Sequence, residues 1–128
     1  MANVGITGIG GVFFRARDSA ALARWYKEKL DLPVESWGGV KFGWRDDPSA
    51  SPTTVWSPFK HDTEYFGRPE QQWMLNYRVA DLDAALAELA RRGVEILPKR
   101  DDSEFGRFAW IVDCEGNRIE LWQPPAGG

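Results

Sequence analysis

The carboxylate of Glu120 has the clearest potential for acid–base chemistry in this sequence. It lies in segment 118–122, which reads as a strand whose side chains alternate between two faces. There it could act as a general base, accept a hydrogen bond from a ligand, or pair with a cation. Arg15, Arg78 and Arg118 are expected on the same face. We prefer the ion-pair interpretation, because a buried carboxylate needs cationic compensation.

Two arginines occupy equivalent positions in two similar segments, Arg15 in residues 12–18 and Arg78 in residues 75–81. If both point inward, they form a two-pronged clamp for a carboxylate or phosphate. The alternative is that each is solvated at a strand end or neutralised by Glu120, and we favour this alternative.

Two tryptophans also correspond, Trp56 and Trp122. They could sandwich a planar or cationic ligand, or they could be hydrophobic plugs, and the sequence leaves both open. Strand alternation predicts one mixed polar and aromatic face, typical of a cavity wall. The predicted ligand-binding residues are Phe13, Arg15, Trp56, Asn76, Arg78, Arg118 and Trp122, with Tyr65 from a loop.

These side chains belong to a sequence that repeats. Residues 41–44 and 107–110 are alike, and Trp56 and Trp122 keep the same spacing of 66 positions. Residues 12–18 resemble residues 75–81 at a spacing of 63. A period near half the chain length predicts two similar halves, with a ligand cleft where they meet.

The expected fold is α+β, with two βαβββ modules in a curved mixed sheet. Asp18 and Asp81 are predicted to cap the helices, and Gly93 to end the second one in a left-handed conformation. Asp31 is expected to end the first helix, and 46–49 and 115–117 to form turns. The predicted elements are strands 9–16, 33–36, 40–45 and 53–57 with helix 19–30, then strands 73–79, 94–97, 107–112 and 118–123 with helix 82–92.

Residues 60–71 form the longest stretch without periodicity and are predicted to link module one (about 6–59) to module two (about 72–124) within a single domain, 1–128. Tyr65 and Phe66, with Gly67 as a hinge, could close over the cleft. The alternative is an ordered linker packed on a partner subunit.

The composition limits the classes of function and the cellular location that we expect for this chain. A net charge of −3 with interspersed signs argues against nucleic-acid binding, and no apolar run is long enough to span a membrane. The single cysteine, Cys114, excludes an internal disulfide and fits a reducing compartment, so a cytoplasmic location is expected. The seven tryptophans suit both a core and an aromatic cavity wall.

The chain resembles the vicinal oxygen chelate superfamily, which includes glyoxalase I, bleomycin-resistance proteins and extradiol dioxygenases. The resemblance covers nearly the whole chain. Its most specific motif is the closing segment 108–124 with Asp113-Cys-Glu-Gly-Asn117-Arg-Ile-Glu120-Leu, supported by 12–18, 79–81 and Gly93-Val94. It implies paired βαβββ modules and, as in other small members, a homodimer.

Metal-using members carry His or Glu at four inward positions, which the resemblance places at Gly11, Thr54, Met74 and Glu120 of this sequence. Only Glu120 is a credible ligand for a hard divalent ion, because glycine has no donor and methionine is a soft thioether. The lone histidine, His61, could join Glu120 from the linker as a weak second candidate. We therefore expect no metal cofactor.

The predicted function is metal-independent binding of an aromatic or anionic small molecule, in the manner of resistance or sequestration proteins. The alternative is an enzyme, either a glyoxalase-like lyase or isomerase or a relative of the dioxygenases. It would use Glu120 as a base or as a residual metal ligand.

Overall fold

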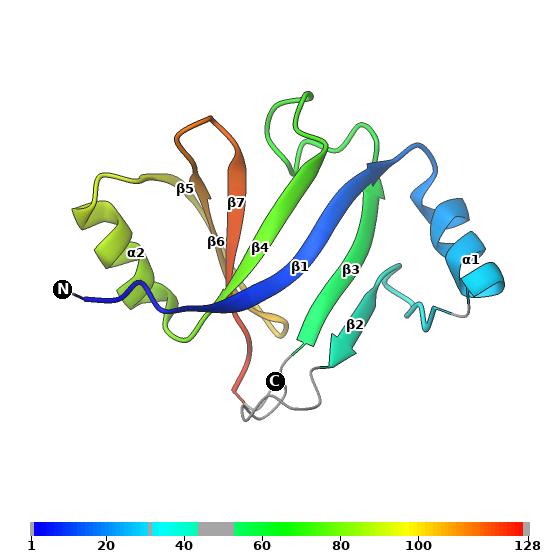
Figure 1. The fold of residues 1–128 in the computed structure, drawn as a ribbon, viewed down its shortest axis with the longest axis horizontal. Coiled ribbons are helices and arrows are strands. Elements are labelled where there is room, and N and C mark those ends of the chain that lie inside the picture. Colours follow the sequence, from blue (N-terminus) through cyan, green and yellow to red (C-terminus); the bar gives the residue numbers. More distant parts are fainter. Residues whose placement is uncertain (1, 31, 44–52, 127–128) are drawn as a thin grey trace. The chain divides into compact units, whose positions relative to one another are not determined.

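The computed structural model describes residues 2–30, 32–43 and 53–126 and has the predicted α+β class, with mixed strand pairing (Figure 1). The chain divides into two compact units. The α1 unit comprises Gly11–Met74, and the α2 unit comprises Met1–Gly10 with Leu75–Gly128. Strand β1 (Ile6–Ala16) contributes to both units. The module and linker boundaries inferred from sequence stay a prediction.

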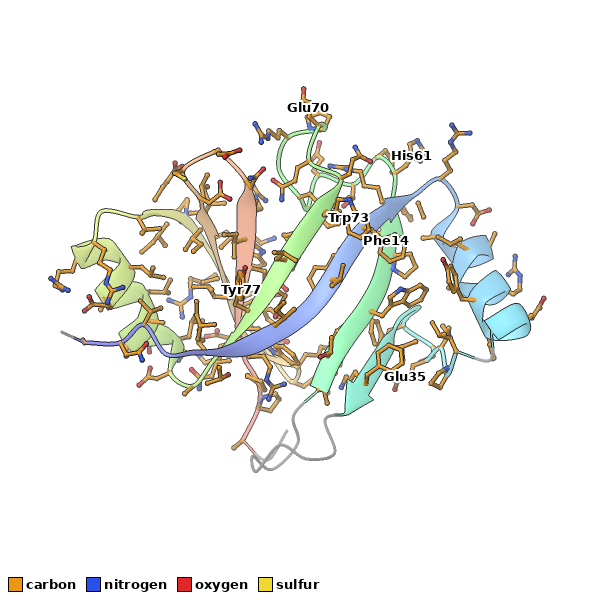
Figure 2. The ribbon with its side chains drawn as sticks, in the orientation of Figure 1. Phe14, Glu35, His61, Glu70, Trp73 and Tyr77 are labelled. Carbon is orange, nitrogen blue, oxygen red and sulfur yellow. The ribbon has the colours of Figure 1, made fainter. Side chains whose placement is uncertain are left out.

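The α1 unit contains most of β1, then α1 (Ser19–Leu30), β2 (Val40–Gly43) and β3 (Thr53–Lys60). Strand β3 pairs with β1 in parallel and with β2 antiparallel. Aromatic rings pack on the face that carries α1; Figure 2 shows Phe14 of β1 beside Trp73, and their ring centroids are 5.8 Å apart.

The α2 unit contains β4 (Trp73–Val79) from Leu75 onward, α2 (Leu82–Arg91), β5 (Glu95–Ser103), β6 (Gly106–Val112) and β7 (Arg118–Gln123). Its strand order is β4-β7-β6-β5, with β4 and β7 parallel and the other pairs antiparallel. One face of these strands packs on α2 as predicted. The core there consists of Val79, Leu82, Ala85, Leu86, Leu89, Ala109, Ile111 and Leu121.

Local signals in the sequence explain the ends of both helices. The side chain of Asp18 accepts a hydrogen bond from the Ala21 amide at 2.9 Å, and Asp81 accepts one from Ala84 at 3.1 Å. Gly93 follows α2 with φ +78°, the left-handed conformation that glycine adopts without strain. The predicted caps are therefore confirmed.

The strand expected at 33–36 is wrong. Pro33 has no amide hydrogen to donate to a ladder, and the next residues fold into a turn in which the Glu35 amide bonds the Gly39 carbonyl. Gly38, with φ +97°, closes this turn. The expected helix end at Asp31, the turn at 46–49 and Trp44 lie outside the described residues.

A carboxylate at the end of α2 makes stability depend on pH. Hydrogen bonds from Arg91 and Arg92 lower the pKa of Glu88 from 4.5 to about 2. Because the folded-state pKa is the lower one, this stabilisation is present above pH 4.5 and is lost as the pH falls toward 2. The urea midpoint of wild-type protein should therefore fall more steeply over this interval than that of Glu88→Gln. The control Glu104→Gln, at an exposed turn residue, should follow wild type, and equal slopes for all three would contradict this assignment.

Candidate functional site

Two rows of side chains cross the strands of the α2 unit on the face opposite α2. Strand register defines them, because residues directly opposite one another in a pair of strands project to the same side. The polar row contains Asn76 of β4, Glu120 of β7 and Trp110 of β6. The aromatic row contains Arg78, Trp122 and Phe108 from the same strands.

The polar row contains a buried amide–carboxylate pair. Asn76 is 2% exposed and Glu120 is 1% exposed, and Nδ2 of Asn76 donates a hydrogen bond to Oε1 of Glu120 at 2.5 Å. A carboxylate can only accept, so it fixes the orientation of the amide. This leaves Oδ1 of Asn76 buried with no hydrogen-bond partner among the described residues. The predicted ion pair of Glu120 with arginine stays a prediction.

Gly10 makes room for this amide. A Cβ atom at position 10 would lie 1.8 Å from Oδ1 of Asn76 and 3.2 Å from Cγ of Arg78. Real Cβ atoms do not approach other heavy atoms so closely, so only glycine allows the polar row its observed packing.

The aromatic row is a stack. The guanidinium carbon of Arg78 lies 5.3 Å from the Trp122 ring centroid, and the Phe108 ring is parallel to Trp122 within 5° at 6.1 Å. The indole Nε1 of Trp122 donates to the Phe105 carbonyl at 2.8 Å, which fixes the ring. An oriented aromatic surface with a cation on it therefore lies next to the Asn76–Glu120 pair.

The structure adds a residue that the sequence analysis missed, Lys99. Its ammonium lies 5.2 Å from the ring centroid of Trp110 in the polar row. A bulge in β5 positions it there, because the register of β5 on β6 shifts between Ile96 and Arg100. Pro98, an unusual residue inside a strand, was the signal available in the sequence.

Arg15 adopts neither the clamp arrangement nor the favoured alternative, because it bonds to the backbone of a loop. Its guanidinium donates to four backbone carbonyls of loop 61–71, at distances of 2.9 to 3.3 Å. A rigid fork of N–H donors suits such a cluster of carbonyl oxygens. The residues whose carbonyls accept these bonds are His61, Thr63, Arg68 and Gln71.

Trp56 lies on the α1 face, not on the face predicted for ligand. It pairs with Val12 of β1, and its ring centroid is 5.5 Å from that of Phe14 and 5.0 Å from that of Tyr26 in α1. The face predicted for Trp56 is therefore wrong. The residue is half-buried and packs against Phe14 and Tyr26 in its own unit, as the alternative of a hydrophobic plug has it.

The error is one of register. Phe59 lies opposite Arg15 in the α1 unit as Trp122 lies opposite Arg78 in the α2 unit, so Phe59 and Trp122 correspond at a spacing of 63. The sequence match at 66 differs from this by an odd number of residues, which turns a strand's side chains to its other face.

Two further predicted site residues pack in an aromatic cluster of the α1 unit. The Phe59 ring lies 5.2 Å from both Phe13 and Tyr65 and 5.1 Å from Phe66, which is fully buried. These contacts give Phe13 and Tyr65 a packing role in the α1 unit. A role of either residue in ligand binding stays a prediction.

Arg118 and His61 belong to neither the polar row nor the aromatic row. Arg118 is half-buried at the start of β7, where it pairs with Val112. His61 is exposed at the turn after β3 (Figure 2). Their roles in binding, and that of His61 toward a metal, remain predictions.

The residues at the positions implied for a metal do not fit a divalent ion. Gly11 offers no donor, and a Cβ there would lie 2.7 Å from a backbone carbonyl oxygen of β3. Met74 is a buried thioether. By strand pairing, the counterpart of Glu120 is Ser57 rather than the predicted Thr54. No group of three His, Cys, Asp or Glu side chains that could hold a metal ion occurs in the described part of the chain.

Comparisons with known proteins agree with this architecture. The family model of the glyoxalase-like domain matches residues 11–122. No curated protein matches the sequence. Within the described ranges, no helix is both long and apolar enough to cross a membrane.

Similar solved structures include two methylmalonyl-CoA epimerases. A variant of the Streptomyces coelicolor enzyme in complex with 2-nitronate-propionyl-CoA has a TM-score of 0.72 and 17% identity, with 94% of this chain and 99% of that chain covered. The Mycobacterium tuberculosis enzyme has a TM-score of 0.61 and 21% identity, with 97% and 93% covered. A structure described as an NAD-dependent benzaldehyde dehydrogenase from Legionella pneumophila has a TM-score of 0.59 and 18% identity, with 89% and 97% covered. At these identities the similarity shows the fold alone.

Proposed function

We propose that this chain, which belongs to the glyoxalase-like domain family, binds a small planar molecule on the inner face of its α2 unit. The inner face is the sheet face opposite α2, which carries the polar and aromatic rows. The observation that carries this proposal is the buried Oδ1 of Asn76, which has no hydrogen-bond partner among the described residues. Buried acceptors are nearly always satisfied, so this atom is a site for a donor supplied by a ligand.

The neighbouring side chains indicate what else such a ligand contains. Trp122 offers a fixed aromatic surface for a planar body, and Arg78 lies on that surface. Arg78 is 7% exposed, and its Cγ and Oδ1 of Asn76 both lie near the Cβ position of Gly10, so binding at Oδ1 requires this buried side chain to move. A planar aromatic molecule with a hydroxyl or N–H group fits these requirements. No metal takes part in this binding.

Matched ligands test the proposal. The protein should bind 2-naphthol at least about tenfold more tightly than 2-methylnaphthalene, because only the hydroxyl satisfies Oδ1 of Asn76. Asn76→Leu should remove this preference and leave the binding of 2-methylnaphthalene within about threefold of wild type. Calorimetry gives the affinities, and circular dichroism confirms that the variant folds. Equal affinities for the two ligands in wild-type protein would contradict the proposal.

A second candidate function is proton transfer next to a carbonyl group, with Glu120 as the base. It is favoured by the hydrogen bond from Asn76 that orients this buried carboxylate, because a fixed base needs little reorganisation in the transition state. The epimerases of similar fold suggest a thioester as the substrate to test. Deuterium exchange at the α-carbon of methylmalonyl-CoA in D2O should then require Glu120 and cease in Glu120→Gln. Exchange no faster than the background with wild-type protein would remove this candidate.

A further inference from the structure

The bulge in β5 lies directly opposite the polar row. Ile96 pairs with Ile111 and Arg100 pairs with Ala109, so residues 97–99 face Trp110 alone. Bulges redirect side chains and are common next to binding sites. Here the redirected side chain is Lys99, whose ammonium comes to lie on the Trp110 ring.

An ammonium on an aromatic face can be drawn to an anion. Attraction to a ring quadrupole is weaker than a charge-assisted hydrogen bond to a carboxylate, and the lysine stem is long and flexible. If the ammonium moves to a ligand carboxylate, it uncovers the Trp110 face, and the aromatic body of the ligand can pack there. Trp110 lies beside Glu120, so this face is adjacent to the Asn76–Glu120 pair.

We propose that Lys99 and Trp110 form an anion subsite next to the Asn76–Glu120 pair, and that the ligand is a planar aromatic carboxylate carrying a hydrogen-bond donor. This inference rests on the proposed function and specifies its ligand class. The ligand carboxylate is bound by the Lys99 ammonium, and the hydrogen-bond donor is bound by Oδ1 of Asn76.

Two ligands that share a ring and a hydroxyl test the subsite, namely 2-naphthol and 6-hydroxy-2-naphthoate. Wild-type protein should bind the carboxylate about tenfold more tightly, and added salt should reduce this preference. Lys99→Met should bring the two affinities within about twofold of each other, whereas Lys99→Arg should retain the preference. The control Lys60→Met, at an exposed lysine of the α1 unit, should leave both affinities unchanged.

The outcomes separate this inference from the function on which it rests. If wild-type protein binds 2-naphthol but does not prefer the carboxylate, or if folded Lys99→Met retains the preference, the subsite is overturned and the proposed function stands. If neither naphthalene binds, the proposed function fails and the subsite fails with it.

Discussion

Replacing Gly10 by alanine should lower the free energy of unfolding by about 2 kcal/mol and weaken the binding of 2-naphthol at least about tenfold. The new methyl group would occupy the space of Oδ1 of Asn76, which lies 1.8 Å from the ideal Cβ position. Asn76 cannot withdraw easily, because its amide is buried and bonded to Glu120. Denaturant unfolding and calorimetry measure the two effects.

The matched control for Gly10→Ala is the double variant with Asn76→Ala, which removes the side chain that clashes. The destabilisation caused by Gly10→Ala should be much smaller in the Asn76→Ala background, a coupling that a double-mutant cycle detects. Additive losses would show that Gly10 acts through its backbone and not by making room for the amide.

Arg15→Met should lower the free energy of unfolding by about 3 kcal/mol. It removes four hydrogen bonds from a charged donor and leaves the carbonyls of loop 61–71 to find other partners. Arg15→Lys should recover only part of this loss, because a point charge cannot replace the guanidinium fork. Urea unfolding gives the stabilities, and hydrogen exchange in residues 61–71 should accelerate.

Arg17→Met is the control for Arg15→Met. Arg17 follows two residues later and is exposed in the bend just after β1, so its replacement should change stability by less than about 0.5 kcal/mol. Similar losses for the two variants, or unchanged hydrogen exchange in the loop of Arg15→Met, would contradict the role given to Arg15.

Local signals in the sequence predicted most of the fold, because they act over a few residues. The aspartate caps, the glycine after α2 and the alternation of β4 and β7 each report one short segment, and the structure confirms them. The strand expected at 33–36 fails for an equally local reason, the missing amide hydrogen of Pro33.

The candidate site was less predictable, because it depends on which strands pair and in what register. Asn76, Arg78, Glu120 and Trp122 come together as the alternation predicted. Trp56 lies on the other face of its own unit, because the sequence match at 66 and the strand register at 63 differ by an odd number of residues. Lys99 could not be placed from sequence, since a bulge interrupts the alternation of side chains along a strand. The position of the bulge follows from the pairing of β5 with β6.

Indole N–H resonances test most directly whether the ligand binds on the inner face of the α2 unit. The protein should be labelled with ¹⁵N and titrated with 2-naphthol, and the resonances of Trp56, Trp110 and Trp122 assigned by replacing each with phenylalanine. We expect saturable shifts for Trp110, which lies beside Glu120 in the polar row, and for Trp122 in the aromatic row, with little change for Trp56. Saturable shifts of Trp56 with Trp110 and Trp122 unmoved would contradict this expectation and place the binding site in the α1 unit.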